Sequence, residues 1–137
     1  MHYDATMHVI AIQPQTIFQA LADQTRLRVM RLLIVTDEQV CLCELVDSLL
    51  MSQYKLSRHV KTLRQAGLLS ATRDGRWIYH RLVTTPDYLL HLHRSIESLP
   101  DPDGMFEGDV KRFEERLCLR ESGRCRVGVQ NDALKSG

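Results

Sequence analysis

The chain has 137 residues, of which 44% are hydrophobic, and a formal net charge of +1. This content suffices for one modest hydrophobic core and excludes two independent domains of ordinary size. Its apolar runs are shorter than the roughly 20 residues that span a membrane, and its first residues lack the pattern of a signal peptide. We therefore expect a cytoplasmic protein with no membrane partner, whose 4 cysteines remain free thiols in a reducing compartment.

Charge is unevenly distributed along the chain. Residues 87–121 contain more Asp and Glu than Lys and Arg, whereas residues 52–82 are strongly basic. The basic segment is expected to face a phosphate backbone and the acidic segment to face away from it. Within residues 52–82 only Asp74 is acidic, and the basic residues are Lys55, Arg58, Lys61, Arg64, Arg73, Arg76 and Arg81.

Apolar periodicity predicts two helices before residue 40. The first spans residues 14–22 and begins with Pro14, which suits a first helical turn. Asp23 is placed to cap the second helix, which starts at Gln24 and closes at residues 36–38.

The following segments have the pattern of a winged helix-turn-helix. A third helix carries an apolar stripe over residues 42–49, and Ser52 caps a fourth helix that stops at Gly67. The apolar period then changes from helix to strand. Two strands within residues 68–82 flank an Asp-Gly pair at residues 74–75, which favours a tight hairpin turn. This hairpin is the expected wing.

The C-terminal part contains two more helical patterns. Residues 85–87 open one helix, which Pro100 ends, and the other has its apolar side over residues 106–117. The rest of the chain to Gly137 has little apolar content, so we expect a mobile tail.

The predicted fold class is therefore mainly α with a β-hairpin, a homodimeric winged helix-turn-helix. Residues 1–100 are expected to form the DNA-binding and dimerisation domain. Residues 101–137 are expected to form a linker, a short amphipathic helix and the mobile, cysteine-containing tail. The flanking helices, residues 14–22 and 87–99, are apolar along one side, and we expect them to cover each other in the dimer.

One side of the fourth helix has side chains that suit a DNA major groove. Arg58 can bind a guanine edge or a phosphate through its forked guanidinium, and Lys61 suits a phosphate. Basic residues also flank the hairpin tip, within reach of a minor groove. The alternative is an ordinary solvated surface helix. The predicted DNA-binding residues are Gln53, Tyr54, Lys55, Ser57, Arg58, His59, Lys61, Arg73 and Arg76.

Motifs follow one another at residues 21–28, 41–45, 52–60, 63–69 and, in the wing, 73–79. Together they resemble the ArsR/SmtB family of metal-sensing repressors, over about residues 15–85 of this chain. The resemblance implies a homodimer that binds operator DNA, represses transcription and is released when a toxic metal or metalloid binds. Two positions depart from the family: Tyr54 stands where many relatives have proline, and Val46 stands where a third cysteine is common.

Cys41 and Cys43 stand just before the predicted recognition helix. Thiolates select soft ions, so the pair is a candidate metal site. Residues two apart point about 200° apart on a regular helix, so both can hold one ion only at the start of the helix or if binding unwinds its first turn. A helix N-terminus also lowers the pKa of a thiol. Alternatively, Cys41 is a small buried residue of the core.

By resemblance, the Cys-x-Cys pair is similar to the site of arsenite and antimonite sensors, which bind through three sulfurs. The expected inducer is then As(III) or Sb(III), with no organic cofactor, bound at Cys41, Cys43 and a third cysteine. The C-terminal segment must supply that third sulfur. Cys118 is favoured because it directly follows an ordered helix, which lowers the entropy cost of fixing it, and Cys125 is the alternative. The alternative is that Cys118 and Cys125 are thiols of a mobile tail with no connection to the site.

Other interpretations rest on the same residues. The thiols could sense oxidation, or could bind cadmium or lead, which are also soft ions. Residues 118–124 fit the Cys-x5-Arg loop of phosphatases and arsenate reductases, but that loop needs a preceding strand and a following helix, so no enzyme is expected. Zinc sensors of the family carry Asp-x-His near the fifth helix, where this chain has Leu89, so zinc is not expected there.

Overall fold

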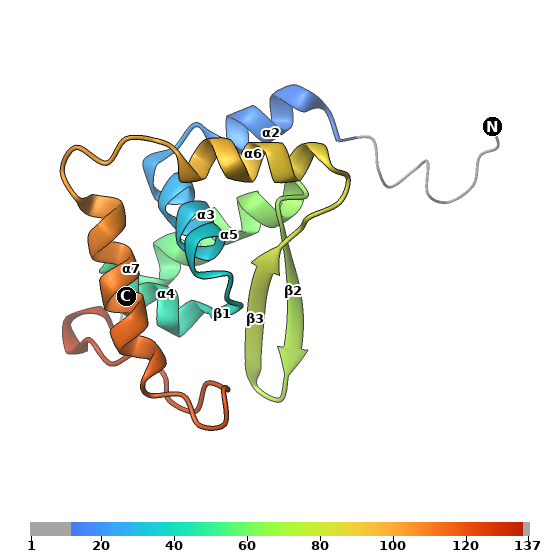
Figure 1. Cartoon of the computed structure of the whole chain (residues 1–137). Coiled ribbons are helices and arrows are strands. Elements are labelled where there is room, and N and C mark those ends of the chain that lie inside the picture. Colours follow the sequence, from blue (N-terminus) through green and yellow to red (C-terminus); the bar gives the residue numbers. More distant parts are fainter. Residues whose placement is uncertain (1–11, 136–137) are drawn as a thin grey trace.

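A computed structural model describes residues 12–135 (Figure 1). It has the predicted winged helix-turn-helix architecture, mainly helical with a small antiparallel sheet. None of its helices, within the part described, is long and apolar enough to cross a membrane. The elements in chain order are α2 (Pro14–Leu21), α3 (Gln24–Thr36), β1 (Val40–Cys41), α4 (Leu42–Leu49), α5 (Gln53–Gln65), β2 (Leu69–Asp74), β3 (Trp77–Leu82), α6 (Tyr88–Glu97), α7 (Met105–Leu117) and the short 3-10 helix η1 (Asp132–Leu134).

Both predicted helix caps are confirmed. The carboxylate of Asp23 accepts a hydrogen bond from the backbone N–H of Arg26 at 3.1 Å, which starts α3. The hydroxyl of Ser52 accepts one from the backbone N–H of Lys55 at 3.3 Å, which starts α5. Each cap satisfies an N–H that the first helical turn leaves without a partner. The recognition helix therefore starts where its sequence predicts, although Tyr54, in its first turn, stands where many relatives have proline.

The hydrophobic core lies between α3, α4, α5 and α7. Met30, Leu45, Leu56 and Phe113 belong to one buried cluster and are fully inaccessible to solvent. The apolar side of α5 is buried in this core, so its opposite side must face away from the protein. Phe113 belongs to the predicted sixth helix, which is thereby part of the same core.

The hairpin is shifted by one residue from its predicted position. Asp74 pairs with Trp77, so the two turn residues are Gly75 and Arg76 rather than the Asp-Gly pair. Gly75 has φ +65°, a left-handed conformation that glycine adopts without strain. The prediction was wrong because both pairs contain Gly75, and only the cross-strand register decides which neighbour joins the turn.

The third strand, β1, was not predicted. Its two residues pair with the outer edge of β3, Val40 opposite His80 and Cys41 opposite Tyr79. Such a short strand has no apolar period of its own and forms because β3 offers an unpaired edge. The pairing connects the wing directly to the start of α4.

The segment after α7, for which the sequence predicts a mobile tail, folds back along α7 toward α4 and the wing (Figure 1). Residues 121 and 124 form an isolated antiparallel bridge, and the chain then runs to η1. Arginines of α7 and of this segment, together with backbone N–H groups of the segment, hold it against α4, as described below. These contacts bring residues distant in sequence to the thiol pair.

Candidate metal centre and nucleic-acid interface

The junction between β1 and α4 lets Cys41 and Cys43 face the same side. Cys41 is the N-cap of α4, with φ −84° and ψ 155°, and Cys43 lies in the first helical turn. The carboxylate of Glu44 accepts a hydrogen bond from the backbone N–H of Cys41 at 2.9 Å, which fixes the turn. Because Cys41 has an extended backbone, the divergence expected on a regular helix does not apply.

Cys125 is the third thiol in this place. The sulfurs of Cys41, Cys43 and Cys125 all lie within 4.8 Å of one another, and Cys43 Sγ is 3.6 Å from Cys125 Sγ. Cys118, the favoured candidate, is exposed at the end of α7, and its thiol lies 3.7 Å from the carbonyl of Glu114. The structure therefore brings the alternative cysteine to the pair and leaves the favoured one outside the cluster.

A buried ion pair docks the segment that carries Cys125. Arg116 Nε donates to Asp47 Oδ2 at 2.7 Å, and its Nη2 donates to the carbonyls of residues 127–128 at 3.0 and 2.9 Å. Asp47 also accepts hydrogen bonds from the backbone N–H groups of Gln130 and Asn131 at 2.9 to 3.0 Å. The side chains of Asp47 and Arg116 are only 9% and 3% exposed, so both charges depend on these partners.

A second anchor joins the cluster to the wing. The backbone N–H of Cys125 donates to Tyr79 Oη at 2.7 Å, and Tyr79 is itself buried. The guanidinium of Arg124 lies 3.9 Å from the centre of the Tyr79 ring and donates to Asp74 Oδ2 at 2.6 and 2.9 Å. Because Cys41 pairs with Tyr79 through the sheet, two of the three cysteines contact the same wing residue.

Glu44 is fully buried next to the thiols, where its negative charge would oppose thiolate formation. Arg120 compensates it with two hydrogen bonds from Nε and Nη2, at 2.7 and 2.8 Å. Arg120 also donates to the carbonyl of Gln39 at 2.7 Å, and so ties the end of α7 to the loop before β1. Because the Glu44 carboxylate is bound by an arginine, the sulfurs are the atoms of the cluster that are free to act as metal ligands.

The three thiols have different acidities. The hydrogen bond from Cys41 lowers the pKa of Cys43 to about 7, helped by a hydrogen bond from Cys125 and the charge of Arg116, and opposed by burial and by Glu44. The same hydrogen bond to Cys43, together with burial, raises the pKa of Cys41. Burial raises the pKa of Cys125. Among these three thiols, Cys43 therefore has the largest thiolate fraction at neutral pH, and the thiolate is the form that can act as a metal ligand.

Alkylation of Cys43 should report this acidity. We expect its rate with iodoacetamide to rise through a midpoint near the pKa of about 7, below the ordinary value of 9.0 for a cysteine thiol. The thiolate is favoured above this midpoint and lost below it. In Cys41→Ala the midpoint should move upward, because the principal hydrogen-bond donor is gone. Peptide mass spectrometry across pH measures both profiles, and identical midpoints in the two proteins would refute the assignment.

The predicted DNA-reading face of α5 is exposed, except for one residue. The Arg58 guanidinium lies 5.7 Å from the Tyr54 ring, so these two side chains share one surface. His59 instead points back toward α3: its Nδ1 lies 3.1 Å from Arg26 Nη1 and 3.7 Å from Asp23 Oδ2. The exposed residues are Gln53, Tyr54, Lys55, Ser57, Arg58 and Lys61 on α5, with Arg73 and Arg76 in the wing.

Arg26 is a basic residue of this face that the sequence analysis missed. With Lys55, Arg58 and Lys61 it lines a hollow of about 600 Å³ beside α5. Its place in the capping motif of α3 gave no signal of a position next to the recognition helix. The missed residues around the thiols, such as Asp47 and Arg116, were likewise indistinguishable from ordinary helix-surface charges.

The thiol pair and the DNA-reading face meet at one cavity. This cavity, of about 320 Å³, is lined by Cys41 and Cys43 together with Gln53 and Arg76. Arg76 also stacks on Trp77, with its guanidinium 4.6 Å from a ring centre. Residues predicted to bind metal and residues predicted to bind DNA therefore line the same cavity.

The fold and this arrangement define a winged helix-turn-helix protein with a cysteine cluster. A family model described as "Bacterial regulatory protein, arsR family" matches residues 23–71. The "Putative arsenical resistance operon repressor ArsR2" of Halobacterium salinarum is 30% identical over 91 residues, 66% of this chain and 71% of that protein. The chain belongs to the ArsR family of bacterial regulatory proteins.

Two further relatives match shorter parts. The "Arsenic resistance transcriptional regulator ArsR1" of Pseudomonas putida is 48% identical over 71 residues, which are 52% of this chain and 55% of that protein. The "Arsenical resistance operon repressor" of Escherichia coli K12 is 44% identical over 69 residues, 50% of this chain and 58% of that protein. The chain thus spans little more than half the length of these two relatives.

Proposed function

We propose that this protein is a dimeric transcriptional repressor that leaves its operator when As(III) or Sb(III) binds at Cys41, Cys43 and Cys125. The observation that carries the proposal is the convergence of three thiols within 4.8 Å, between the start of α4 and the wing. The printed names of the relatives, which concern arsenic resistance, support the choice of inducer.

The donor set favours a thiophilic ion. The described cluster contains sulfur only, with no histidine or carboxylate ligand. Soft thiolate ligands select soft metals and metalloids over hard cations such as magnesium or calcium, which prefer oxygen. When arsenite binds as As(OH)3, each As–S bond that forms replaces an As–OH bond, and the thiol proton leaves with that hydroxide as water.

The position of the thiols supplies a route to the DNA-reading elements. A bound ion must hold the sulfurs of Cys41 and Cys43 in one fixed geometry, and Cys41 both caps α4 and pairs with β3 of the wing. Helix α4 packs against α5, which carries Arg58. A shift of this junction would therefore change how the recognition helix and the wing sit relative to each other, and DNA binding requires both.

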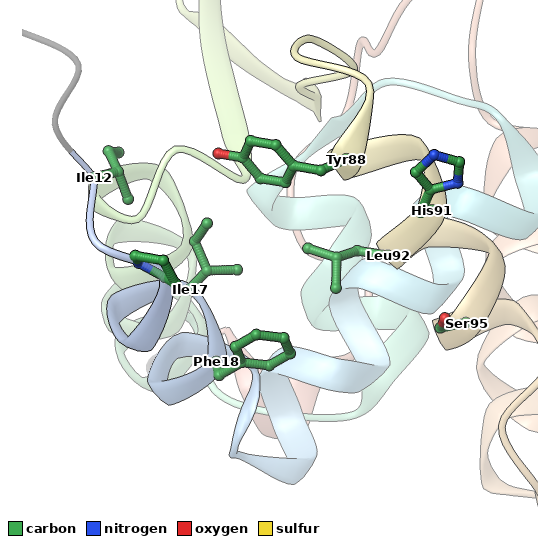
Figure 2. Close-up of a pocket in the computed structure, with 8 residues that line it drawn as sticks. Ile12, Ile17, Phe18, Tyr88, His91, Leu92 and Ser95 are labelled. Atoms are coloured by element: carbon green, nitrogen blue, oxygen red, sulfur yellow. The ribbon is translucent and has the colours of Figure 1, made fainter.

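The apolar hollow between α2 and α6 supports dimerisation. It has a volume of about 470 Å³, and Figure 2 shows Ile17 and Phe18 of α2 and Leu92 and Tyr88 of α6 around it. Phe18 is 61% exposed in the single chain. Such an apolar surface on flanking helices is suited to a two-fold interface with a second copy of the chain. The expected operator is then an inverted repeat with half-sites about one helical turn apart.

Phe18→Glu should dissociate the dimer. The side chain is exposed in the single chain, so a charge is tolerated there, but it would be desolvated in the interface. We expect the dimer dissociation constant to rise at least about 30-fold, as for an interface hot spot, with operator affinity falling in parallel. Sedimentation equilibrium measures this. Leu119→Glu, at an exposed apolar residue outside the hollow, is the control and should stay dimeric. Equal behaviour of the two variants would place the interface elsewhere.

A redox sensor is the second candidate, because Cys43 Sγ and Cys125 Sγ lie only 3.6 Å apart and could form a disulfide under oxidation. Operator release titrated with arsenite, cadmium and peroxide separates the candidates. Arsenite and cadmium are added with reductant, and peroxide is added without it. The proposed function predicts release by arsenite at the lowest concentration. Release by peroxide alone would replace it with redox sensing, and preference for cadmium would change the inducer.

A further inference from the structure

The helix that carries Cys43 also carries an anchor for the cysteine that arrives from the C-terminal segment. Asp47 lies four residues after Cys43, one helical turn along the same face of α4. Both oxygens of its carboxylate are used: Oδ2 binds Arg116, and the two oxygens together accept from Gln130 and Asn131. Helix α4 thus carries both Cys43 and the docking point, Asp47, for the segment that carries Cys125.

Cys125 lies between two anchors. On its N-terminal side, Arg124 is held by Asp74 of the wing at 2.6 Å. On its C-terminal side, Arg116 holds the carbonyls of residues 127–128, and Asp47 holds the N–H groups that follow. The Arg124–Asp74 ion pair is at the surface, where ion pairs contribute little, although the backbone N–H of Cys125 itself donates to the buried Tyr79. The Asp47–Arg116 ion pair is almost fully buried, so of the two ion pairs it should do more to determine where Cys125 sits.

We propose that Asp47, acting with Arg116, is the positioning residue that holds Cys125 beside Cys41 and Cys43 as the third sulfur donor. This inference rests on the proposed function and deepens it. A ligand that is already docked does not have to be ordered when the ion binds, so its contribution to affinity is larger. Without Asp47, the Cys125 segment would remain covalently attached, but it would lose conformational entropy when the ion binds. The site would then have only two protein sulfurs.

Asp47→Ala, Cys125→Ser and the double variant test the proposal. The readouts are the arsenite dissociation constant from anaerobic titration and the number of sulfurs bound to arsenic from X-ray absorption. We expect each single variant to weaken arsenite binding at least about tenfold, with the sulfur count falling from three to two. The double variant should bind no more weakly than Cys125→Ser alone, because residues that act through one another are not additive.

Arg112→Gln is the matched control. Arg112 Nε donates to the carbonyl of Ser48 at 2.6 Å, so it joins the same two helices one turn earlier but has no hydrogen bond to the Cys125 segment. Its loss should lower thermal stability and leave arsenite affinity unchanged. Gln130→Pro is a second variant on the segment itself. It removes one N–H donor to Asp47 without touching the helix interface, and should weaken arsenite binding severalfold.

Two results would overturn the positioning role. One is a sulfur count of three with wild-type affinity in both Asp47→Ala and Gln130→Pro. The other is a double variant weakened beyond Cys125→Ser by the full factor that Asp47→Ala shows alone, since that additivity marks a general structural effect. Failure of wild-type protein to bind arsenite at all would instead refute the proposed function, so the two failures are distinguishable.

Discussion

Cys41→Ser and Cys43→Ser should each keep operator binding within about threefold of wild type and lose release by arsenite. Serine is nearly the same size as cysteine, and mutations away from the DNA-contacting residues add little to the binding free energy. An oxygen donor, however, is a poor ligand for a soft ion. The largest loss is expected for Cys43→Ser, because Cys43 has the lowered pKa in the cluster. Operator binding by fluorescence anisotropy, with and without arsenite, measures both effects.

Cys118→Ser provides the matched control for these variants. It makes the same chemical change at an exposed thiol outside the cluster. Release by arsenite should therefore match wild type. If Cys41→Ser and Cys43→Ser also respond at wild-type arsenite concentrations, the pair is structural and the proposed inducer site is wrong.

Arg58→Ala should weaken operator binding about 5- to 150-fold, the range for a bidentate contact worth roughly 1–3 kcal/mol. Arg58 is exposed on α5 beside Tyr54, opposite the side that is buried in the core. Because it contacts neither the thiols nor the hollow between α2 and α6, arsenite affinity and dimerisation should be unchanged. Anisotropy with operator DNA at several salt concentrations measures the loss and its electrostatic part.

Arg94→Ala is the control for net charge, since Arg94 is an exposed arginine of α6. It removes one positive charge at a position far along the chain from the recognition helix. We expect its operator affinity to stay within about threefold of wild type, as for a charge that makes no phosphate contact. If Arg58→Ala weakens binding no more than Arg94→Ala, Arg58 does not belong to the reading face.

The parts of the fold that depend on local sequence could be predicted. Apolar stripes and the caps at Asp23 and Ser52 gave the helices close to their observed bounds, since capping and periodicity act within a few residues. Strand β1 could not be predicted, because it exists only by pairing with β3 some 40 residues later. The one-residue shift of the hairpin has the same origin in cross-strand register.

In the candidate site, too, the parts that depend on local sequence could be predicted and the parts that depend on distant contacts could not. Cys41 and Cys43 were predicted from their spacing, their position before the recognition helix and the family resemblance, and their position at the start of a helix was one of the two predicted ways for them to converge. Cys125 was ranked below Cys118 because its segment was taken to cost more entropy to fix. That ranking left out the hydrogen bonds of Asp47 and Arg116, which link residues far apart in sequence. The contact of His59 with Arg26 could not be predicted either, because it joins residues of two different helices.

In the proposed function, the thiol cluster and the DNA-reading face are two coupled sites. The cavity that Cys41 and Cys43 share with Gln53 and Arg76, and the contacts of Tyr79 with Cys41 and Cys125, support the proposed coupling. Coupling between two binding sites is reciprocal: if arsenite weakens operator binding by some factor, the operator must weaken arsenite binding by the same factor.

The most direct test is therefore the arsenite dissociation constant of wild-type protein measured twice under anaerobic reductant, once free and once saturated with operator DNA. We expect the operator to raise this dissociation constant about 5- to 150-fold, the range typical of allosteric coupling, and the factor to equal the loss of operator affinity caused by arsenite. Equal dissociation constants with and without operator would show that the thiols bind the metalloid without controlling DNA, and would refute the proposed function.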